Sequence, residues 1–164
     1  MNLKRINQFS PEMARAEFLR CCGSKAWAAA MVAKRPFENE TALMQAADET
    51  WNALEPGDWL EAFAAHPKIG EKSRHKEHQN TKDLSEKEQA GVANAAERTL
   101  QLLETYNRDY ESKYGFIFIV CATGKTGEEM LELIRTRIAN DPAKELRVAA
   151  AEQSKITQLR LQKI

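Results

Sequence analysis

The chain has 164 residues, enough for one domain with a real core and too few for two of ordinary size. Its 24 basic and 24 acidic residues cancel, so neither nucleic acid nor a membrane surface is expected as a partner, whereas a small anionic ligand needs only one or two local cations. The N-terminus lacks a secretory signal, and the 3 cysteines, two of them adjacent, resemble neither a disulfide framework nor a zinc site. We therefore expect a cytoplasmic protein.

Two serines mark the first expected helices. Ser10 before Pro11 is typical of an N-cap with proline at the first helical position, and Gly23 is expected to close that helix. Ser24 predicts the start of a second helix, which ends before Pro36.

A third helix is expected where apolar residues recur at helical spacing, and Pro56 with Gly57 ends it. The recurring residues are Leu43, Ala47, Trp51 and Leu54. Asp58 predicts the cap of a short helix that runs into His66 and Pro67. Because the residue before a proline is pushed out of the α region, His66 marks a forced helix end. Such a side chain is well placed for chemistry, but it equally serves to end the helix.

The second half begins with residues 70–83, which are almost entirely polar and predict a long exposed loop. A long helix is expected from Ser85 to about Lys113, and Gly115 ends it. Residues 116–121 form a continuous apolar run with no strand to pair with, so we expect a buried extended segment whose backbone is available to a ligand.

Two more helices complete the predicted fold, one at about residues 128–139 and one that starts at Pro142 with Asp141 as its cap. No internal repeat or linker is visible. The expectation is a single all-α domain over residues 1–164, with about seven or eight helices and one buried extended segment.

The stretch from Phe116 to Met130 has the order strand, loop, Gly-Lys-Thr, helix, as a phosphate-binding P-loop does. The full motif needs a glycine where this chain has Ile119, and without it the backbone N–H groups cannot form an anion cradle. A polar turn before a helix is the better interpretation.

His75 and His78 are spaced for one face of a helical turn, but no cysteine or carboxylate at a recognised spacing supports a metal site, so a solvated loop face is favoured.

Ser85 and Glu88 fit a capping box, which alone explains both residues. The start of a helix also attracts anions, and Gln89 adds a neutral donor and acceptor there.

Arg160 extends a stripe of the last helix that is expected to face the core. The other members of the stripe are Leu146, Ala149, Gln153 and Ile156. An arginine on such a stripe is costly unless it pairs with an acid or is reserved for an anionic ligand. The alternative is that the chain end frays and the side chain reaches water. Arg147 and Lys155 lie off the stripe and are expected in solvent.

Together these stretches resemble the family of 2-oxo-4-hydroxy-4-carboxy-5-ureidoimidazoline (OHCU) decarboxylases. The resemblance covers nearly the whole chain, with motifs in the family order: HPKIGEK, LSEKEQAG, YNRDYESKYGFIFIV and RIANDPAKELRVAAAEQSKITQLRL. It implies an all-α lyase of purine metabolism that needs no cofactor or metal, and it suggests a homodimer. The reaction would be the last step from urate to (S)-allantoin, in which the substrate loses its carboxylate as CO2.

Matched motif by motif, His66 corresponds to the family's catalytic histidine and Arg160 to its substrate-binding arginine. Glu88 belongs to the family's polar triplet, and we expect it to be catalytic by keeping a proton on His66. The resemblance adds further substrate-binding positions: Pro67, Ser85, Gln89, Phe116, Ile117, Phe118, Ile119 and Val120. One position departs from the family, which usually has proline where this chain has Ile117.

The residues themselves fit this chemistry. A substrate whose ring imine lies beside the departing carboxylate can accept the electron pair itself, so the protein need only position the anion, stabilise developing charge and deliver a proton. His66 is of the residue type that exchanges protons near neutral pH. The competing hypothesis is a helical module that binds a partner without chemistry. That hypothesis explains the balanced charge, but not a histidine before proline together with an arginine on the core-facing stripe.

Overall fold

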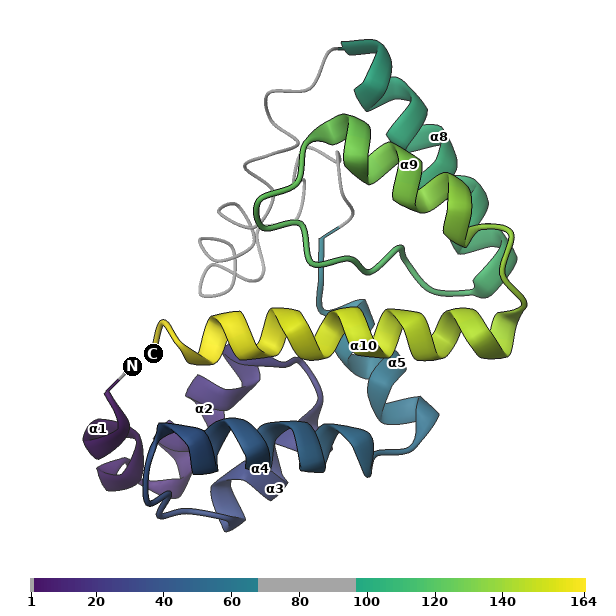
Figure 1. Ribbon diagram of the computed structural model, residues 1–164. Helices are drawn as coiled ribbons and strands as arrows, with labels where there is room; N and C mark the ends of the chain where they lie inside the picture. The colour runs from purple at the N-terminus through teal and green to yellow at the C-terminus, as the bar shows by residue number, and fades with distance from the viewer. Residues whose placement is uncertain (1, 68–96) are drawn as a thin grey trace. The chain divides into compact units, whose positions relative to one another are not determined.

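The computed structural model describes residues 2–67 and 97–164, and all regular secondary structure in these ranges is helical (Figure 1). The described residues form eight helices, in agreement with the predicted all-α class: α1 (Leu3–Gln8), α2 (Pro11–Cys21), α3 (Lys25–Ala33), α4 (Glu40–Asn52), α5 (Pro56–Ala64), α8 (Glu97–Tyr114), α9 (Gly127–Arg137) and α10 (Pro142–Leu161). The chain divides into two compact units, residues 1–65 with 153–164 and residues 66–152.

The predicted serine caps are confirmed. Ser10 Oγ accepts a hydrogen bond from Met13 N at 3.2 Å, and Ser24 Oγ accepts one from Trp27 N at the same distance. Each bond satisfies a backbone donor that the first helical turn leaves without a partner. The short helix α1 was not expected from the sequence. It is held to the first unit by contacts with residues distant in the sequence, such as the two hydrogen bonds between the Asn7 side chain and the Phe37 backbone.

The start of α5 differs from the prediction. The helix begins at Pro56, and Asp58 lies inside its first turn rather than at the cap. Glu55 occupies the N-cap position and makes no side-chain cap bond. Proline fixes a backbone angle suited to the first helical position and has no N–H to satisfy, so it starts this helix without a capping side chain.

The core of the first unit is built around Trp27, which is fully buried. Phe18 meets the Trp27 ring edge to face at 5.9 Å and the Phe37 ring at 6.4 Å. Trp27 Nε1 donates to Ala47 O at 3.1 Å, so the one polar atom of the ring has a partner. This bond also fixes α3 against α4.

The end of α10 packs against α4 in the same unit. Ser154 Oγ donates to Asp48 Oδ1 at 2.6 Å, and Gln158 Nε2 donates to Met44 O at 3.4 Å. The two chain ends meet nearby, with Asn2 N donating to Ile164 O at 2.8 Å (Figure 1). The last turns of α10 are therefore held by the Asp48 side chain and the Met44 carbonyl of α4.

Gly23 has a different role from the one predicted. Helix α2 ends earlier, at Cys21, and φ at Gly23 does not lie in the positive range found at Gly115 and Gly124. A Cβ at position 23 would lie 2.4 Å from Ala65 Cβ, which is closer than two carbon atoms can approach. The glycine thus allows the α2–α3 connection to touch the end of α5.

In the second unit, α8 and α9 lie side by side (Figure 1). Tyr110 is fully buried at their contact, and its ring meets the rings of Phe116 at 5.8 Å and Phe118 at 5.2 Å. The cluster around it has these buried members: Leu103, Phe118, Val120, Ala122, Met130, Leu131 and Ile134. Gly115, with φ of 77°, ends α8 as predicted and turns the chain into this cluster.

Both ends of α9 have partners for their backbone groups. Thr126 and Glu129 form a capping box at its start, with bonds of 3.2 Å and 2.7 Å. Its last carbonyls receive donors from the end of α8. Tyr114 Oη, which has one proton to donate, lies 2.7–3.0 Å from the carbonyl oxygens of residues 137, 138 and 140, and Lys113 Nζ donates to those of 138 and 140. A cation at this end also opposes the helix dipole.

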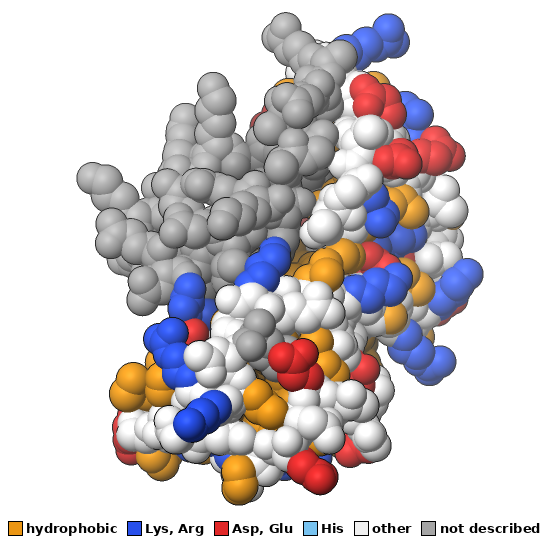
Figure 2. Space-filling model, turned by 60° about the vertical axis from the view of Figure 1, so that its left-hand side comes forward, with side chains coloured by type: hydrophobic (Ala, Val, Ile, Leu, Met, Phe, Trp, Pro, Cys, Tyr) orange, Lys and Arg blue, Asp and Glu red, His pale blue; other side chains and the backbone are white. Residues whose placement is uncertain are grey.

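Charge is mixed over the surface. On the face shown in Figure 2, Lys and Arg side chains are interspersed with Asp and Glu, in keeping with the balance of 24 basic and 24 acidic residues. None of the helices in the described ranges combines the length and apolar character needed to cross a bilayer.

The three cysteines occupy different environments. Cys21 and Cys22 are fully buried, and burial raises the pKa of the Cys21 thiol to about 12 and that of Cys22 to about 11. Cys121 is half-buried. Because the thiolate is the reactive form, the adjacent pair is expected to be inert in the folded protein.

The close approach at Gly23 predicts that Gly23→Ala lowers the free energy of unfolding by about 1–3 kcal/mol, because the added methyl group must displace Ala65. Gly57→Ala is the matched control. Nothing lies within 4 Å of a Cβ at that helical position, so it is expected to be neutral or to stabilise by up to about 1 kcal/mol. Urea unfolding of both variants measures the difference, and equal stabilities would contradict the close contact.

A thiol-specific disulfide reagent at pH 8 is expected to modify one cysteine per native chain, Cys121, and to reach Cys21 and Cys22 only after unfolding. Absorbance of the released thiolate counts the sites against time. The variant Cys121→Ser should show no rapid phase. Rapid modification of all three thiols in the native protein would show that the Cys21–Cys22 pair is accessible.

Candidate active site

His66 lies directly after α5, at the forced helix end predicted from Pro67. The helix ends at Ala64 with Ala65 as its C-cap, and His66 is half-buried. Helix α5 is anchored one turn earlier, where Glu61 Oε2 accepts from Lys25 N at 2.8 Å and Glu61 Oε1 lies 3.2 Å from Lys25 Nζ. The bond from the Lys25 backbone lowers the pKa of Glu61. The helix that precedes His66 is thus fixed in place by Lys25.

The apolar run 116–121, predicted as a buried segment, is buried at its centre and half-buried at Phe116, Ile117 and Cys121, and none of these residues forms a strand. Phe118, Ile119 and Val120 are at most 6% exposed. Two of its backbone groups bind side chains: Ile119 O accepts from Arg137 Nη1 at 2.7 Å, and Cys121 N donates to Glu152 Oε2 at 2.8 Å. A buried backbone without a strand partner needs such bonds.

A buried ion pair lies behind this segment, and the sequence reasoning did not find it. Glu145 Oε1 accepts from Arg137 Nε at 2.8 Å, from Arg137 Nη2 at 2.6 Å and from Tyr110 Oη at 2.5 Å. Glu145 Oε2 accepts from Asn140 Nδ2 at 2.7 Å, and the Glu145 residue is 0% exposed. Burial is the main cause, and the hydrogen bond to Glu145 the second, of a pKa of Tyr110 well above its usual range. The sequence did contain a sign that Glu145 is buried, because it lies four residues before Ala149 and so on the buried stripe of α10.

Arg160 lies on the buried stripe, as predicted. Ala149, Gln153 and Ile156 are at most 4% exposed, Leu146 is only half-buried, and Arg147 and Lys155 face solvent. Arg160 itself is 4% exposed within α10, so the alternative of a frayed chain end is wrong. Its Nη1 lies 3.4 Å from Cys21 O. A buried guanidinium at this position places a positive charge in the interior of the first unit.

Several predicted residues lie outside the described ranges. These are Ser85, Glu88 and Gln89 of the capping-box motif, and His75 and His78 of the polar loop. Among the described residues, no group of three or more His, Cys, Asp or Glu side chains is arranged to hold a metal ion.

The stretch that resembles a P-loop is a turn before a helix, as predicted. Gly124 adopts a φ of 78°, and the Thr126 hydroxyl accepts from Glu129 N at the start of α9. In this position Thr126 is an N-cap.

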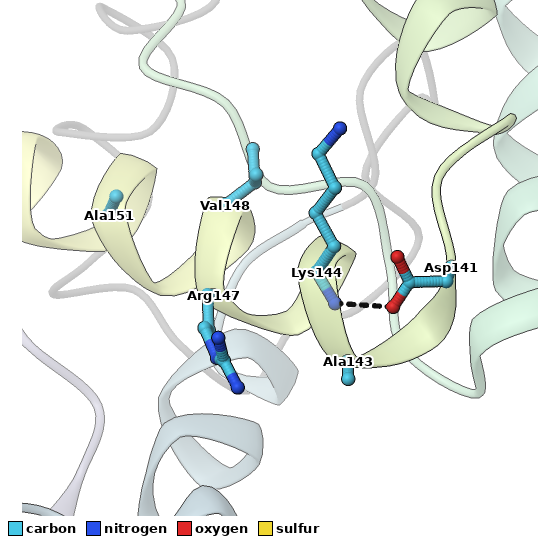
Figure 3. A pocket seen from close by; sticks show the side chains of 6 residues that line it. All are labelled: Asp141, Ala143, Lys144, Arg147, Val148 and Ala151. Atoms are coloured by element: carbon cyan, nitrogen blue, oxygen red, sulfur yellow. Dashed lines mark hydrogen bonds between the residues drawn. The ribbon is translucent and has the colours of Figure 1, made fainter.

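A surface hollow of about 450 Å³ lies along the first turns of α10. Figure 3 shows its lining, with Asp141 Oδ1 accepting from Lys144 N at 2.9 Å, which confirms Asp141 as the cap of α10. The lining residues are Asp141, Ala143, Lys144, Arg147, Val148 and Ala151. None of them is a predicted site residue, so this hollow is not the candidate site.

The chain is similar to proteins of urate breakdown. The "Uric acid degradation bifunctional protein TTL" of Arabidopsis thaliana is 40% identical over 154 residues, which cover 93% of this chain and 48% of that protein. The chain therefore spans about half the length of this relative. The 2-oxo-4-hydroxy-4-carboxy-5-ureidoimidazoline decarboxylase of Amia calva is 28% identical over 100% of this chain and 94% of its own length.

A solved structure agrees with these relatives. The crystal structure of an OHCU decarboxylase in the presence of (S)-allantoin superposes with a TM-score of 0.76 at 38% identity, covering 90% of this chain and 95% of that one. The sequence model of the OHCU decarboxylase family matches residues 7–162. The chain therefore belongs to the OHCU decarboxylase family.

Proposed function

We propose that this chain catalyses the decarboxylation of 2-oxo-4-hydroxy-4-carboxy-5-ureidoimidazoline to (S)-allantoin and CO2, the last step from urate to allantoin. One observation carries the proposal: the similarity to an OHCU decarboxylase extends over 90% of this chain and 95% of that protein, at 38% identity. The similarity thus extends over most of both chains. We propose that residues 1–164 act as one decarboxylase domain.

The proposed reaction needs no cofactor. The bond between the ring carbon and the carboxylate breaks, CO2 leaves, and the adjacent ring imine accepts the electron pair. A proton then returns to the same carbon from one face, which sets the S configuration. The protein has to position the anion, stabilise the developing charge and deliver the proton.

We assign the catalytic roles to His66 and Glu88. A histidine has an ordinary pKa near 6.5, so it can give and take a proton at working pH. His66 suits this role because it is half-buried and follows a helix that Glu61 anchors. Glu88 would keep the histidine protonated if the two side chains meet.

We assign substrate binding to Arg160, to the backbone of the apolar segment and to the flanking polar positions. Arg160 carries a planar guanidinium that can bind a carboxylate through two parallel bonds, and its buried position strengthens such a contact. The full set is Pro67, Ser85, Gln89, Phe116, Ile117, Phe118, Ile119, Val120 and Arg160. We further propose a homodimer that acts in the cytoplasm, where buried reduced thiols are stable.

The test is an assay of the purified chain with freshly generated substrate in the presence of EDTA. Release of CO2 and formation of (S)-allantoin faster than the spontaneous reaction supports the function and the absence of a metal requirement. A helical binding module would leave both the rate and the stereochemistry at the spontaneous level. Activity that EDTA abolishes and an added metal restores would overturn the cofactor-free reaction.

If His66 exchanges the proton, His66→Asn is expected to fold normally and to lose about 10²- to 10⁴-fold in turnover. Asparagine preserves polar character but cannot titrate. Steady-state kinetics, together with a melting temperature for each protein, measure the effect. A variant within about threefold of the wild-type kcat would return His66 to the role of ending a helix.

Arg160→Met keeps the hydrophobic stem of the side chain and removes its charge. We expect kcat/KM to fall about 30- to several-thousand-fold, the equivalent of roughly 2–5 kcal/mol for losing one partner of a desolvated charge pair. Arg160→Lys should recover little, because a point charge cannot hold a carboxylate at two points. Melting temperatures distinguish a substrate-binding role from a structural one. A methionine variant that unfolds would show that Arg160 is needed for the stability of the fold.

A further inference from the structure

The apolar segment has its peptide groups fixed from outside by two side chains. Arg137, from the last turn of α9, donates Nη1 to Ile119 O at 2.7 Å. Glu152, from α10, accepts the N–H of Cys121 at 2.8 Å. These bonds fall on the two peptide groups that flank Val120.

The two bonds determine where the polar groups of Val120 point. Both peptides are trans, because the one cis peptide of the described chain is at Arg35–Pro36. In a planar trans peptide the C=O and the N–H point in opposite directions. With Ile119 O held by Arg137, the Val120 N–H points away from Arg137. With Cys121 N held by Glu152, the Val120 C=O points away from Glu152.

Arg137 is itself held rigidly. Its Nε and Nη2 both bind Glu145 Oε1, and its guanidinium carbon lies 4.5 Å from the centre of the Phe118 ring. Glu145 is completely buried and also accepts from Tyr110 and Asn140. A guanidinium held by several bonds in this way has little freedom to rotate, so its remaining donor fixes the Ile119 carbonyl in one place.

From this geometry we infer that Arg137 and Glu152 are positioning residues for the reaction, which hold the Ile119–Cys121 backbone in the orientation that receives the substrate. The inference rests on the proposed function, in which this segment binds the substrate ring. Neither side chain needs to touch the substrate. Each acts through the backbone bond that it makes, and a small misplacement of a binding group is enough to slow a reaction strongly.

Glu152 gives the sharper test, because it is half-buried, whereas Arg137 belongs to a buried ion pair with Glu145. Glu152→Leu removes the acceptor for Cys121 N, while Glu152→Gln keeps an acceptor oxygen and removes only the charge. We expect kcat/KM to fall at least tenfold in the leucine variant and to stay within threefold of wild type in the glutamine variant. Glu132→Leu, at an exposed acid of α9 in the same unit, is the control and should be unchanged.

Amide hydrogen exchange provides a readout that does not depend on activity. Exchange of the Cys121 N–H should accelerate at least tenfold in Glu152→Leu and remain slow in Glu152→Gln, with melting temperatures close to wild type in both. Faster exchange together with slower catalysis, and recovery of both by glutamine, supports the inference. A leucine variant with accelerated exchange and wild-type kinetics overturns it, as does one whose exchange is unchanged.

Arg137→Lys tests the second contact. Lysine keeps the positive charge beside Glu145 but cannot bind that carboxylate and Ile119 O with the same fixed fork, so kcat/KM should fall at least tenfold. Wild-type kinetics in this variant would remove Arg137 from the positioning role. If the wild-type chain itself fails to accelerate decarboxylation, the proposed function falls and this inference falls with it. If the wild type is active and the Glu152 and Arg137 variants have wild-type kinetics, the inference is overturned but the proposed function stands.

Discussion

The buried carboxylate of Glu145 is the constraint on which the second unit depends. A charge without solvent contact is tolerated only when hydrogen bonds replace its hydration, and removing one partner of such a pair costs about 3–5 kcal/mol. Here Tyr110 comes from α8, Arg137 from α9, and Glu145 from α10. Three helices are thus fixed by a single charged group, whose bonds have strict geometry. An apolar contact among the same helices would permit sliding, whereas this cluster specifies one arrangement.

The same cluster explains how an apolar segment remains ordered without a strand. Residues 118–120 are buried in the core, where water is excluded, so their peptide groups need partners from the protein or from a ligand. Arg137 and Glu152 serve two of those groups. Hydrogen bonds from side chains differ from those of a sheet, because they satisfy only some of the backbone N–H and C=O groups. The remaining backbone groups can point toward a ligand. Such a backbone suits the recognition of a small polar ring.

The proposed reaction requires few functional groups from the protein. The reaction requires a place for an anion, a proton on one face and the exclusion of competing water, and all three follow from placing ordinary side chains accurately. The chain has no excess of charge to attract its substrate over long distances, with 24 basic and 24 acidic residues. In the proposed function, local cations carry the recognition, since a buried arginine such as Arg160 interacts with a carboxylate more strongly than an exposed one does.

The sequence by itself determined the helical class, the caps at Ser10, Ser24 and Asp141, the buried stripe that ends at Arg160, and the family. The caps and the stripe rest on spacing within a few residues, so local chemistry specifies them, whereas the family follows from motifs in order along nearly the whole chain. Only the tertiary structure decided the contact of Gly23 with Ala65 and the pairing of Arg137 with Glu145 and Ile119. Helix-forming patterns state which face of a helix is buried but not which side chain of another element meets it. Partners far apart in the chain are chosen by packing, and packing is a property of the folded molecule.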